Sequence, residues 1–301
     1  MSPTPAFRVE PVAYEIGRAE LRAVRDAVFV LEQGVPLELE RDALDPVCHH
    51  VIARDAAGQP IGTGRLTPDH RVGRMAVLAD WRGKGVGDAL LLALIEQARQ
   101  LGWRELALHA QVSAIGFYAR RGFLPYGERF SEAGLDHQSM RSVLDKPNVV
   151  ETRAAALAAM LAMIAGTRRS LYLYSRELDP GLLDAPEVLA ALRRLATHGG
   201  EVRVLLQDAG APQRALAPLL NLAQRLPSAF AFRAVEEPGD RAYPSAFAAN
   251  DAGGWYFRPL GHRFDGEVRL GDDARARQLR ATFEPVWERS RACSEYRALG
   301  L

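Results

Sequence analysis

Cysteine and lysine are both scarce in this chain, which has two of each among 301 residues: Cys48 and Cys293, and Lys84 and Lys146. Two distant cysteines with no CxxC spacing predict free thiols and a reducing compartment, and they argue against a disulfide framework. The sequence also lacks any run of about 18 uncharged apolar residues, and its N-terminal stretch has no signal-peptide core. We therefore expect a cytoplasmic protein with no membrane partner.

Excess charge is lacking as well. The 38 Lys and Arg residues balance 37 Asp and Glu residues, which leaves a formal charge of +1. No basic stripe with interleaved aromatic residues occurs, so we expect no nucleic-acid partner. A content of 48% hydrophobic and 25% charged residues is typical of a globular protein, and 301 residues are enough for two domains.

The first half alternates short strand patterns with helical ones. A strand is predicted at 7–14 and a helix at 18–32, followed by three extended runs within 49–77 that are typical of an antiparallel meander. Helical periodicity returns at 89–103, and then come a strand at 104–110, a short helix at 113–123 and strands at 124–130 and 137–144. This order predicts an α/β (α+β) domain with a mixed, largely antiparallel sheet.

The periodicity stops at the segment LDKPNVVE, around Pro147, which we interpret as a linker. The predicted domains are therefore 1–146 and 147–301. In the second, an alanine-rich helix is followed by strands that alternate with helices, which predicts an α/β domain with a mainly parallel sheet.

The stretch DWRGKGVGDALLLAL, residues 80–94, carries the clearest functional signal. Glycines at 83, 85 and 87 allow a ligand to approach the backbone, and the following helix directs unpaired N–H groups at the same place. A Walker loop is excluded because no GK followed by Ser or Thr is present, and position 88 is Asp where a Rossmann GxGxxG loop needs Gly. The pattern predicts an anion site of another kind.

The stretch Arg82-Gly83-Lys84-Gly85-Val86-Gly87 resembles the acyl-coenzyme A loop of the GCN5-related N-acetyltransferase (GNAT) family. The family's second motif, a short helix with Asn, Ala and Tyr before Gly-Phe, is matched by Gln111, Ala114, Tyr118 and Gly122-Phe123, with Gln in place of Asn. The resemblance spans about 7–143, and the segment VFVLEQGVPLELERDALD is similar to the ElaA- and YjcF-like branch.

The resemblance implies a GNAT fold and the use of acetyl-CoA as acyl donor, without a metal. It implies that Met75, Ala76 and Val77 pair with the pantetheine arm and that the backbone from Gly83 to Asp88 holds the pyrophosphate. Arg82 and Lys84 would add charged contacts, and Gln111 would belong to the coenzyme site. The side chain of Asp88 is expected to complement the dipole at the helix N-terminus.

For proton transfer the resemblance implies Tyr118 as the acid that protonates the leaving thiolate, although this tyrosine could also simply pack in an aromatic helix face. Arg74 stands where many relatives have a carboxylate. Glu32 and His137 therefore both remain candidates for the catalytic base, and each of them could instead be structural. Acceptor contacts are expected around 31–45 and 130–138, without a named acceptor beyond a small-molecule or peptide amine.

The second half weakly resembles one half of a phospholipase D-like domain. If Asp251 takes the aspartate position of the HxKxxxxD motif, the His and Lys positions fall on Pro244 and Ala246, so the nucleophile is missing. We expect a binding or dimerising module, with a homodimer as one option. An alternative for the whole chain is a non-catalytic acyl-CoA sensor that signals through this module.

Overall fold

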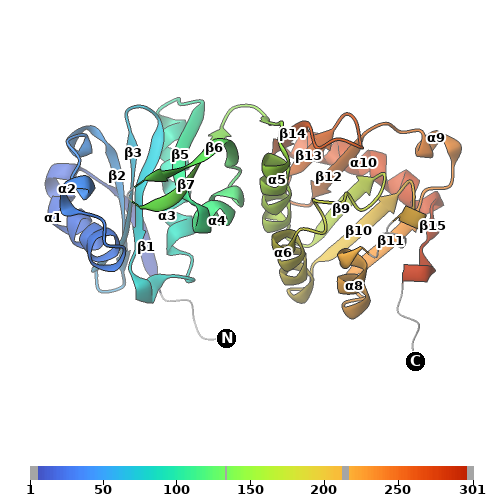
Figure 1. Cartoon of the computed structure of the whole chain (residues 1–301), viewed down its shortest axis with the longest axis horizontal. Coiled ribbons are helices and arrows are strands. Elements are labelled where there is room, and N and C mark those ends of the chain that lie inside the picture. Colours follow the sequence, from blue (N-terminus) through green and yellow to red (C-terminus); the bar gives the residue numbers. More distant parts are fainter. Residues whose placement is uncertain (1–5, 133, 212–216, 297–301) are drawn as a thin grey trace. The chain divides into compact units, whose positions relative to one another are not determined.

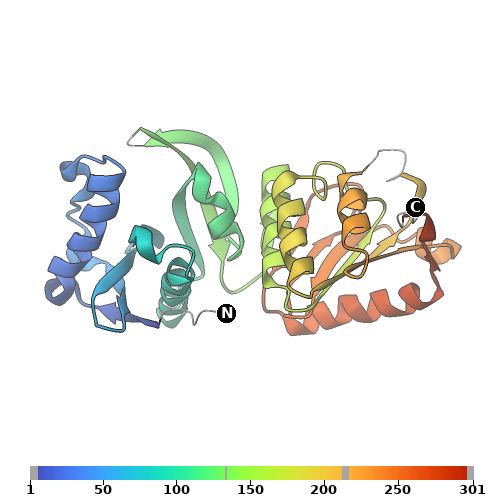
Figure 2. The same cartoon turned by 90° about the horizontal axis from the view of Figure 1, so that it is seen from below.

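The computed structural model describes residues 6–132, 134–211 and 217–296 (Figures 1 and 2). The chain divides into two compact units, one holding the residues up to 111 together with 127–145, the other holding 112–126 and the residues from 146 onward. The predicted boundary at 146/147 lies one residue from this division, whereas residues 112–126 are grouped with the second unit.

The first unit contains a seven-stranded sheet in the order β1-β2-β3-β4-β5-β7-β6. Its strands are β1 (Phe7–Val12), β2 (His49–Asp55), β3 (Pro60–Thr67), β4 (Arg71–Val77), β5 (Glu105–Gln111), β6 (Leu124–Glu132) and β7 (Leu135–Val143). Of the neighbours with a determined register, β4 and β5 are parallel and the others are antiparallel. The predicted mixed α/β fold is confirmed for this unit, and the registered neighbours agree with a largely antiparallel sheet.

Helices pack against the strands of this sheet. They are α1 (Tyr14–Arg25), its π-helical continuation η1 (Asp26–Glu32), α2 (Leu37–Glu40) and α3 (Val86–Gln100), with short 3-10 turns η2 (Asp45–Val47) and η3 (Ala79–Trp81). Val24 and Val28 recur at helical spacing and pack on Ala76 of β4. The predicted helix at 18–32 thus exists, but it begins at Tyr14 and its last seven residues are π-helical.

Helix α3 approaches β3 closely because two strand positions are glycine. A Cβ at Gly62 would lie 2.9 Å from Leu90 Cδ1, and a Cβ at Gly64 would lie 2.6 Å from the sulfur of Met75. Larger residues at these positions would push α3 and β4 away from the strand. The two glycines therefore set the position of the helix whose N-terminus follows the glycine loop.

Strand β4 is irregular in its middle. The β3–β4 register shifts between Thr63 and Arg65, and Arg74 has a left-handed backbone with φ of 49°. With β5, β4 shares the single pair Arg71–Ala107. From Val72 onward β4 has therefore separated from β5, and the sheet is open between them.

The second unit contains an eight-stranded sheet in the order β15-β11-β10-β9-β12-β13-β14-β8. Its strands are β8 (Asn148–Val150), β9 (Ser170–Ser175), β10 (Glu201–Leu206), β11 (Phe230–Ala234), β12 (Ala246–Asn250), β13 (Trp255–Arg258), β14 (Gly266–Arg269) and β15 (Arg291–Ala292). Its helices are α4 (Ile115–Ala119), α5 (Arg153–Gly166), α6 (Pro186–Thr197), α8 (Pro218–Arg225), α9 (Pro238–Arg241) and α10 (Asp273–Arg289), with 3-10 turns η4 (Val112–Ala114) and η5 (Ser294–Tyr296).

The prediction of a mainly parallel second sheet is wrong. Only β9, β10 and β11 run parallel, and the other registered neighbours are antiparallel. The physical reason is the connection after Asn250: a turn of four residues joins β12 to β13, which is too short for the crossover that a parallel pair needs. The segment around Pro147, interpreted as a linker, also contributes β8 to this sheet.

Candidate active site

The candidate site begins at the opening between β4 and β5. Met75, Ala76 and Val77 lie on β4 beyond its last pair with β5. Ala76 and Val77 pair with Thr63 and Gly62 of β3, and none of the three residues pairs with β5. Backbone groups of this segment on the open side have no partner strand among the described residues, so an extended ligand arm could bind there as an additional strand.

The glycine loop follows at the end of this opening. Gly83 and Gly85 have φ of 71° and 85°, a conformation that favours glycine, and no heavy atom lies within 4 Å of a Cβ built at either position. Gly85 immediately precedes α3, and the first regular helical bond runs from Ala89 N to Gly85 O. Val86, Gly87 and Asp88 form the first turn, so the helix presents an anion-binding N-terminus to this loop.

Arg82 and Lys84, the two cations of the loop, have partners within the unit. Arg82 donates from Nη1 and Nη2 to the carboxylate of Glu32 at 2.7 and 2.6 Å, and from Nε to Val77 O at 3.0 Å. The ammonium of Lys84 lies 5.3 Å from the centroid of the Trp81 ring. Both side chains are exposed, so an arriving anion can reach them.

Glu32 is thus brought to the loop by Arg82. The hydrogen bonds and the charge of Arg82 lower the pKa of this carboxyl group. A carboxylate with a lowered pKa is a weak proton acceptor near neutral pH. The geometry therefore supports an electrostatic and orienting part for Glu32 better than that of a base.

Gln111 and His137 meet on the other side of the opening. They are directly paired residues of β5 and β7, so their side chains lie on the same face of the sheet. Gln111 donates to Gln33 Oε1 at 3.1 Å, which connects this face to the residue after Glu32. Two pairs of predicted residues, Arg82 with Glu32 and Gln111 with His137, are therefore each brought together, and Gln111 also bonds Gln33, the residue next to Glu32 in the sequence.

The surroundings of His137 determine which of its two ring nitrogens carries the proton in the neutral imidazole. Its Nδ1 lies 2.9 Å from Leu135 O, and its ring is stacked on Phe130. Because a carbonyl oxygen only accepts, Nδ1 carries the proton in that contact, and Nε2 keeps its lone pair. No partner of Nε2 occurs among the described residues, so this nitrogen can accept a proton.

Tyr118 lies on α4 and is 9% exposed, with ring contacts to Phe117 and Phe123. Burial raises the pKa of its hydroxyl group to about 12. The hydroxyl therefore stays protonated at neutral pH, as a proton donor must. Its segment, 112–126, is grouped with the second unit.

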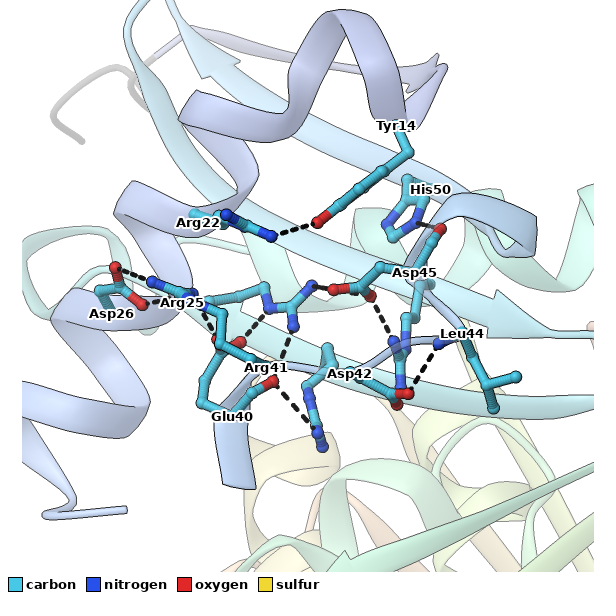
Figure 3. A network of polar contacts seen from close by, with 12 residues as sticks. Tyr14, Arg22, Arg25, Asp26, Glu40, Arg41, Asp42, Leu44, Asp45 and His50 are labelled. Carbon is cyan, nitrogen blue, oxygen red and sulfur yellow. Dashed lines mark hydrogen bonds and ion pairs between the residues drawn. The ribbon is translucent and has the colours of Figure 1, made fainter. Parts of the chain in front are cut away.

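Sequence reasoning missed a buried ionic network beside this site (Figure 3). Arg25, which is 1% exposed, donates to Glu40 and to Asp45, and both carboxylates are also 1% exposed. Arg65 donates to Asp45 and Asp42. The available signal was the density of acidic residues in LELERDALD, which follows a helix carrying an arginine among its apolar positions.

In the second unit, Asp251 lies in the β12–β13 turn and accepts hydrogen bonds from the backbone N–H groups of Arg168 and Arg169 at 2.9 and 2.8 Å. Ala246, at the predicted lysine position of the phospholipase D motif, is fully buried in β12. The aspartate therefore holds a turn, and these positions offer no nucleophile.

Two other classes of site, a metal site and a membrane span, have no support among the described residues. No group of three or more His, Cys, Asp or Glu side chains is arranged to hold a metal ion there. Nor does any helix in that part of the chain combine the length and apolar character needed to cross a membrane.

Comparisons with known proteins agree with the geometry of the first unit. A model of the acetyltransferase (GNAT) domain matches residues 16–144, and a model of a domain of unknown function, DUF7931, matches 152–299. YjcF of Bacillus subtilis, named as an uncharacterized N-acetyltransferase, is 36% identical over 121 residues, which are 39% of this chain and 86% of YjcF.

Among solved structures, an acyl-CoA N-acyltransferase from Pseudomonas aeruginosa is 27% identical and has a TM-score of 0.42; the match covers 46% of this chain and 100% of that one. Escherichia coli ElaA is 24% identical with a TM-score of 0.42, over 46% of this chain and 99% of ElaA.

The GNAT domain match lies in the half of the chain that contains the β4–β5 opening and the glycine loop, and YjcF is similar over most of its own length. The family uses acyl-CoA as co-substrate, and membership indicates acyl transfer to an amine. Through residues 16–144, this chain belongs to the GNAT acetyltransferase family.

Proposed function

We propose that the protein is an acetyl-CoA-dependent N-acetyltransferase that transfers the acyl group to a primary amine by direct attack on the thioester. The observation that carries this proposal is the opening between β4 and β5, which ends at a glycine loop and a helix N-terminus. An open strand edge suits the amide-containing pantetheine arm, and the loop suits a pyrophosphate. The pantetheine arm and the pyrophosphate of acetyl-CoA are therefore both matched by one continuous stretch of chain, from the open edge of β4 to the start of α3.

The N–H groups, cations and backbone groups of the site fit acetyl-CoA. The N–H groups at the start of α3 and the exposed cations Arg82 and Lys84 would bind the pyrophosphate. Glu32 would hold Arg82 in position through its bidentate contact. Met75, Ala76 and Val77 would offer their backbone to the arm, and Gln111 would lie beside the acyl end.

The chain's residues then supply the two proton transfers. The amine lone pair forms a C–N bond to the acyl carbon while the C–S bond breaks, so one proton must leave the nitrogen and the sulfur must gain one. We assign the first proton to Nε2 of His137, whose lone pair is free, and assign donation to the sulfur to Tyr118, whose hydroxyl group is held protonated.

For the second unit we propose a binding or dimerising module that retains a phospholipase D-like arrangement without its chemistry. The support is the position of Asp251 in the turn between β12 and β13, together with Pro244 and Ala246 where the reactive His and Lys would stand.

Calorimetric titration with acetyl-CoA tests the loop assignment. We expect saturable binding to the unaltered protein and its loss in Gly85→Glu, because a carboxylate would enter the anion site. Gly102→Glu is the matched control, since Gly102 lies beyond the other end of α3 with φ of 74° and equal free space. Retained affinity in Gly85→Glu, or equal loss in both variants, would refute the assignment.

A further inference from the structure

Arg74 is the most unusual side chain beside the opening. It lies in the irregular part of β4 with φ of 49°, a backbone conformation that a non-glycine residue rarely adopts. It directly precedes Met75, and from Val72 onward β4 is separated from β5. Arg74 is thus a strained residue at the start of the β4 segment proposed to bind the acyl donor. Strain at such a place suggests a functional constraint on its side chain.

The guanidinium group of Arg74 is incompletely satisfied. Its Nη2 donates to the carbonyl oxygens of Leu39 and Glu40 at 3.0 and 3.3 Å. Its Nε is buried and has no hydrogen-bond partner. Within the described residues, no carboxylate forms a direct ion pair with it, although the charges of Glu40 and Asp42 act on it from farther away. Its direct hydrogen-bond partners are backbone carbonyl groups alone.

The nearby carboxylates are already engaged by other arginines. Glu40 binds Arg25 and Arg41, and Asp42 and Asp45 bind Arg65 (Figure 3). Burial, followed by the neighbouring charges of Arg65 and Arg25, lowers the pKa of Arg74. A cation held beside other cations in a partly buried place favours the approach of an anion.

The segment that Arg74 contacts carries exposed leucines beside the exposed Glu38. The side chains of Leu37 and Leu39 are 48% and 56% exposed, and Leu31 and Leu44, on either side along the chain, are 81% and 47% exposed. Glu40, by contrast, is turned inward into the ionic network. The part of the chain expected to contact the acceptor therefore combines an unpaired cation with exposed leucines.

We propose that Arg74 binds a carboxylate of the acceptor, so that the acceptor is a small primary amine with a carboxylate and an apolar side chain, as in an apolar amino acid. This inference rests on the proposed function, since it deepens the acceptor side of that reaction. The carboxylate would complete the partners of the guanidinium, and the apolar side chain would lie on the exposed leucines.

Matched amines test the proposal. L-phenylalanine is compared with 2-phenylethylamine, and L-leucine with 3-methylbutylamine; each pair differs only in the carboxylate. We expect kcat/KM for thiol release from acetyl-CoA to be about ten-fold or more higher for each carboxylate-bearing member, as a charge-assisted contact provides. Equal values within each pair, or a preference for the simple amines, would overturn the proposal.

Two variants locate the effect. Arg74→Gln should bring the ratio within each pair to about one while leaving the KM for acetyl-CoA unchanged, because the coenzyme segment is not altered. Arg71→Gln, on the same strand with its cation paired to Asp69, should keep the full ratio. Retention of the ratio in Arg74→Gln would contradict the assignment to this residue.

Calorimetry separates this inference from the proposed function. Each amine is titrated into the protein with and without coenzyme A, so the comparison within each pair does not depend on turnover. A failure of acetyl-CoA to bind would contradict the proposed function. Equal binding of both amines of a pair would contradict the inference about Arg74. Tighter binding of the carboxylate-bearing members, lost in Arg74→Gln, supports it.

Discussion

At the scale of single residues, Glu32 and His137 are the two proton acceptors that the sequence offers, and their surroundings differ. Glu32 is held by two hydrogen bonds from Arg82, which lower its pKa. His137 has its Nδ1 engaged with a backbone carbonyl and its Nε2 available. The carboxylate is thus occupied by a cation, while the imidazole is left able to accept a proton.

His137→Gln should therefore lower kcat/KM for the amine by about 10²-fold or more, because the group that accepts the proton is removed. His109→Gln is the control, since both ring nitrogens of His109 are already engaged, by Arg71 and Glu132. The measurement is kcat/KM for the amine at saturating acetyl-CoA.

Glu32→Gln should lower kcat/KM less than His137→Gln does in the same assay, because the lowered pKa of Glu32 makes its carboxylate a weak proton acceptor. A larger loss in Glu32→Gln than in His137→Gln would reverse the two assignments.

Some of this site could be predicted from local pattern. The spacing of Gly83 and Gly85 requires no long-range information, because left-handed backbone before a helix favours glycine wherever it occurs. The contacts of Arg82 with Glu32 and of Gln111 with Gln33 join residues far apart in the sequence. No periodicity reports such contacts, so their partners became visible only in the folded chain.

At the scale of elements, the buried ionic network holds the segment from α2 to η2 against α1 and β3. Arg25 lies among the apolar positions of the first helix, and it is 1% exposed because Glu40 and Asp45 cover it from the loop. Helical periodicity cannot predict this burial, since the covering residues belong to a segment without regular pattern.

Arg25→Met should cost about 3–5 kcal/mol of stability in the first unit, because it leaves two buried carboxylates without their cation. Arg104→Met is the control, since the Arg104–Asp145 pair is exposed and its loss should matter by about 0.5 kcal/mol or less. Hydrogen exchange of the β2 and β3 amides measures both. Equal protection in the two variants would contradict a stabilising network.

The same network predicts a loss of stability in acid. Burial alone would raise the pKa of Asp45, but the hydrogen bonds and charges of Arg25 and Arg65 outweigh it and lower the pKa. A lowered folded pKa contributes stability above the unfolded value of about 3.9, and this contribution disappears as the pH falls through the folded pKa. Asp45→Asn should therefore lose less stability than the unaltered protein between pH 5 and 3. Identical losses, measured by the same exchange, would contradict the assignment.

At the scale of the whole molecule, the two halves differ in how far their sequence predicted their fold. In the first, short strands joined by tight turns allow only antiparallel neighbours, and the meander at 49–77 follows directly. In the second, strand–helix units predict parallel pairing correctly for β9, β10 and β11. Strands β12, β13 and β14 follow one another without intervening helices, and it is there that the prediction of a mainly parallel sheet was wrong.

The two hypotheses for the whole chain are an acetyltransferase and an acyl-CoA sensor. Both need the glycine loop, but only the acetyltransferase converts substrate to product. A sensor needs only the donor site, whereas an enzyme also needs an acceptor side and a proton acceptor. Arg74 and His137 provide candidates for both within the first unit. For this reason we favour the acetyltransferase hypothesis over the sensor hypothesis.

The most direct test is steady-state thiol release from acetyl-CoA in the presence of single amines, including free amino acids, polyamines, aminoglycosides and peptide N-termini. The account predicts continuous release over many turnovers with at least one amine, together with transfer of the acetyl group to its nitrogen. Tight acetyl-CoA binding with no release above the rate in buffer, for every amine, would contradict it and identify a sensor.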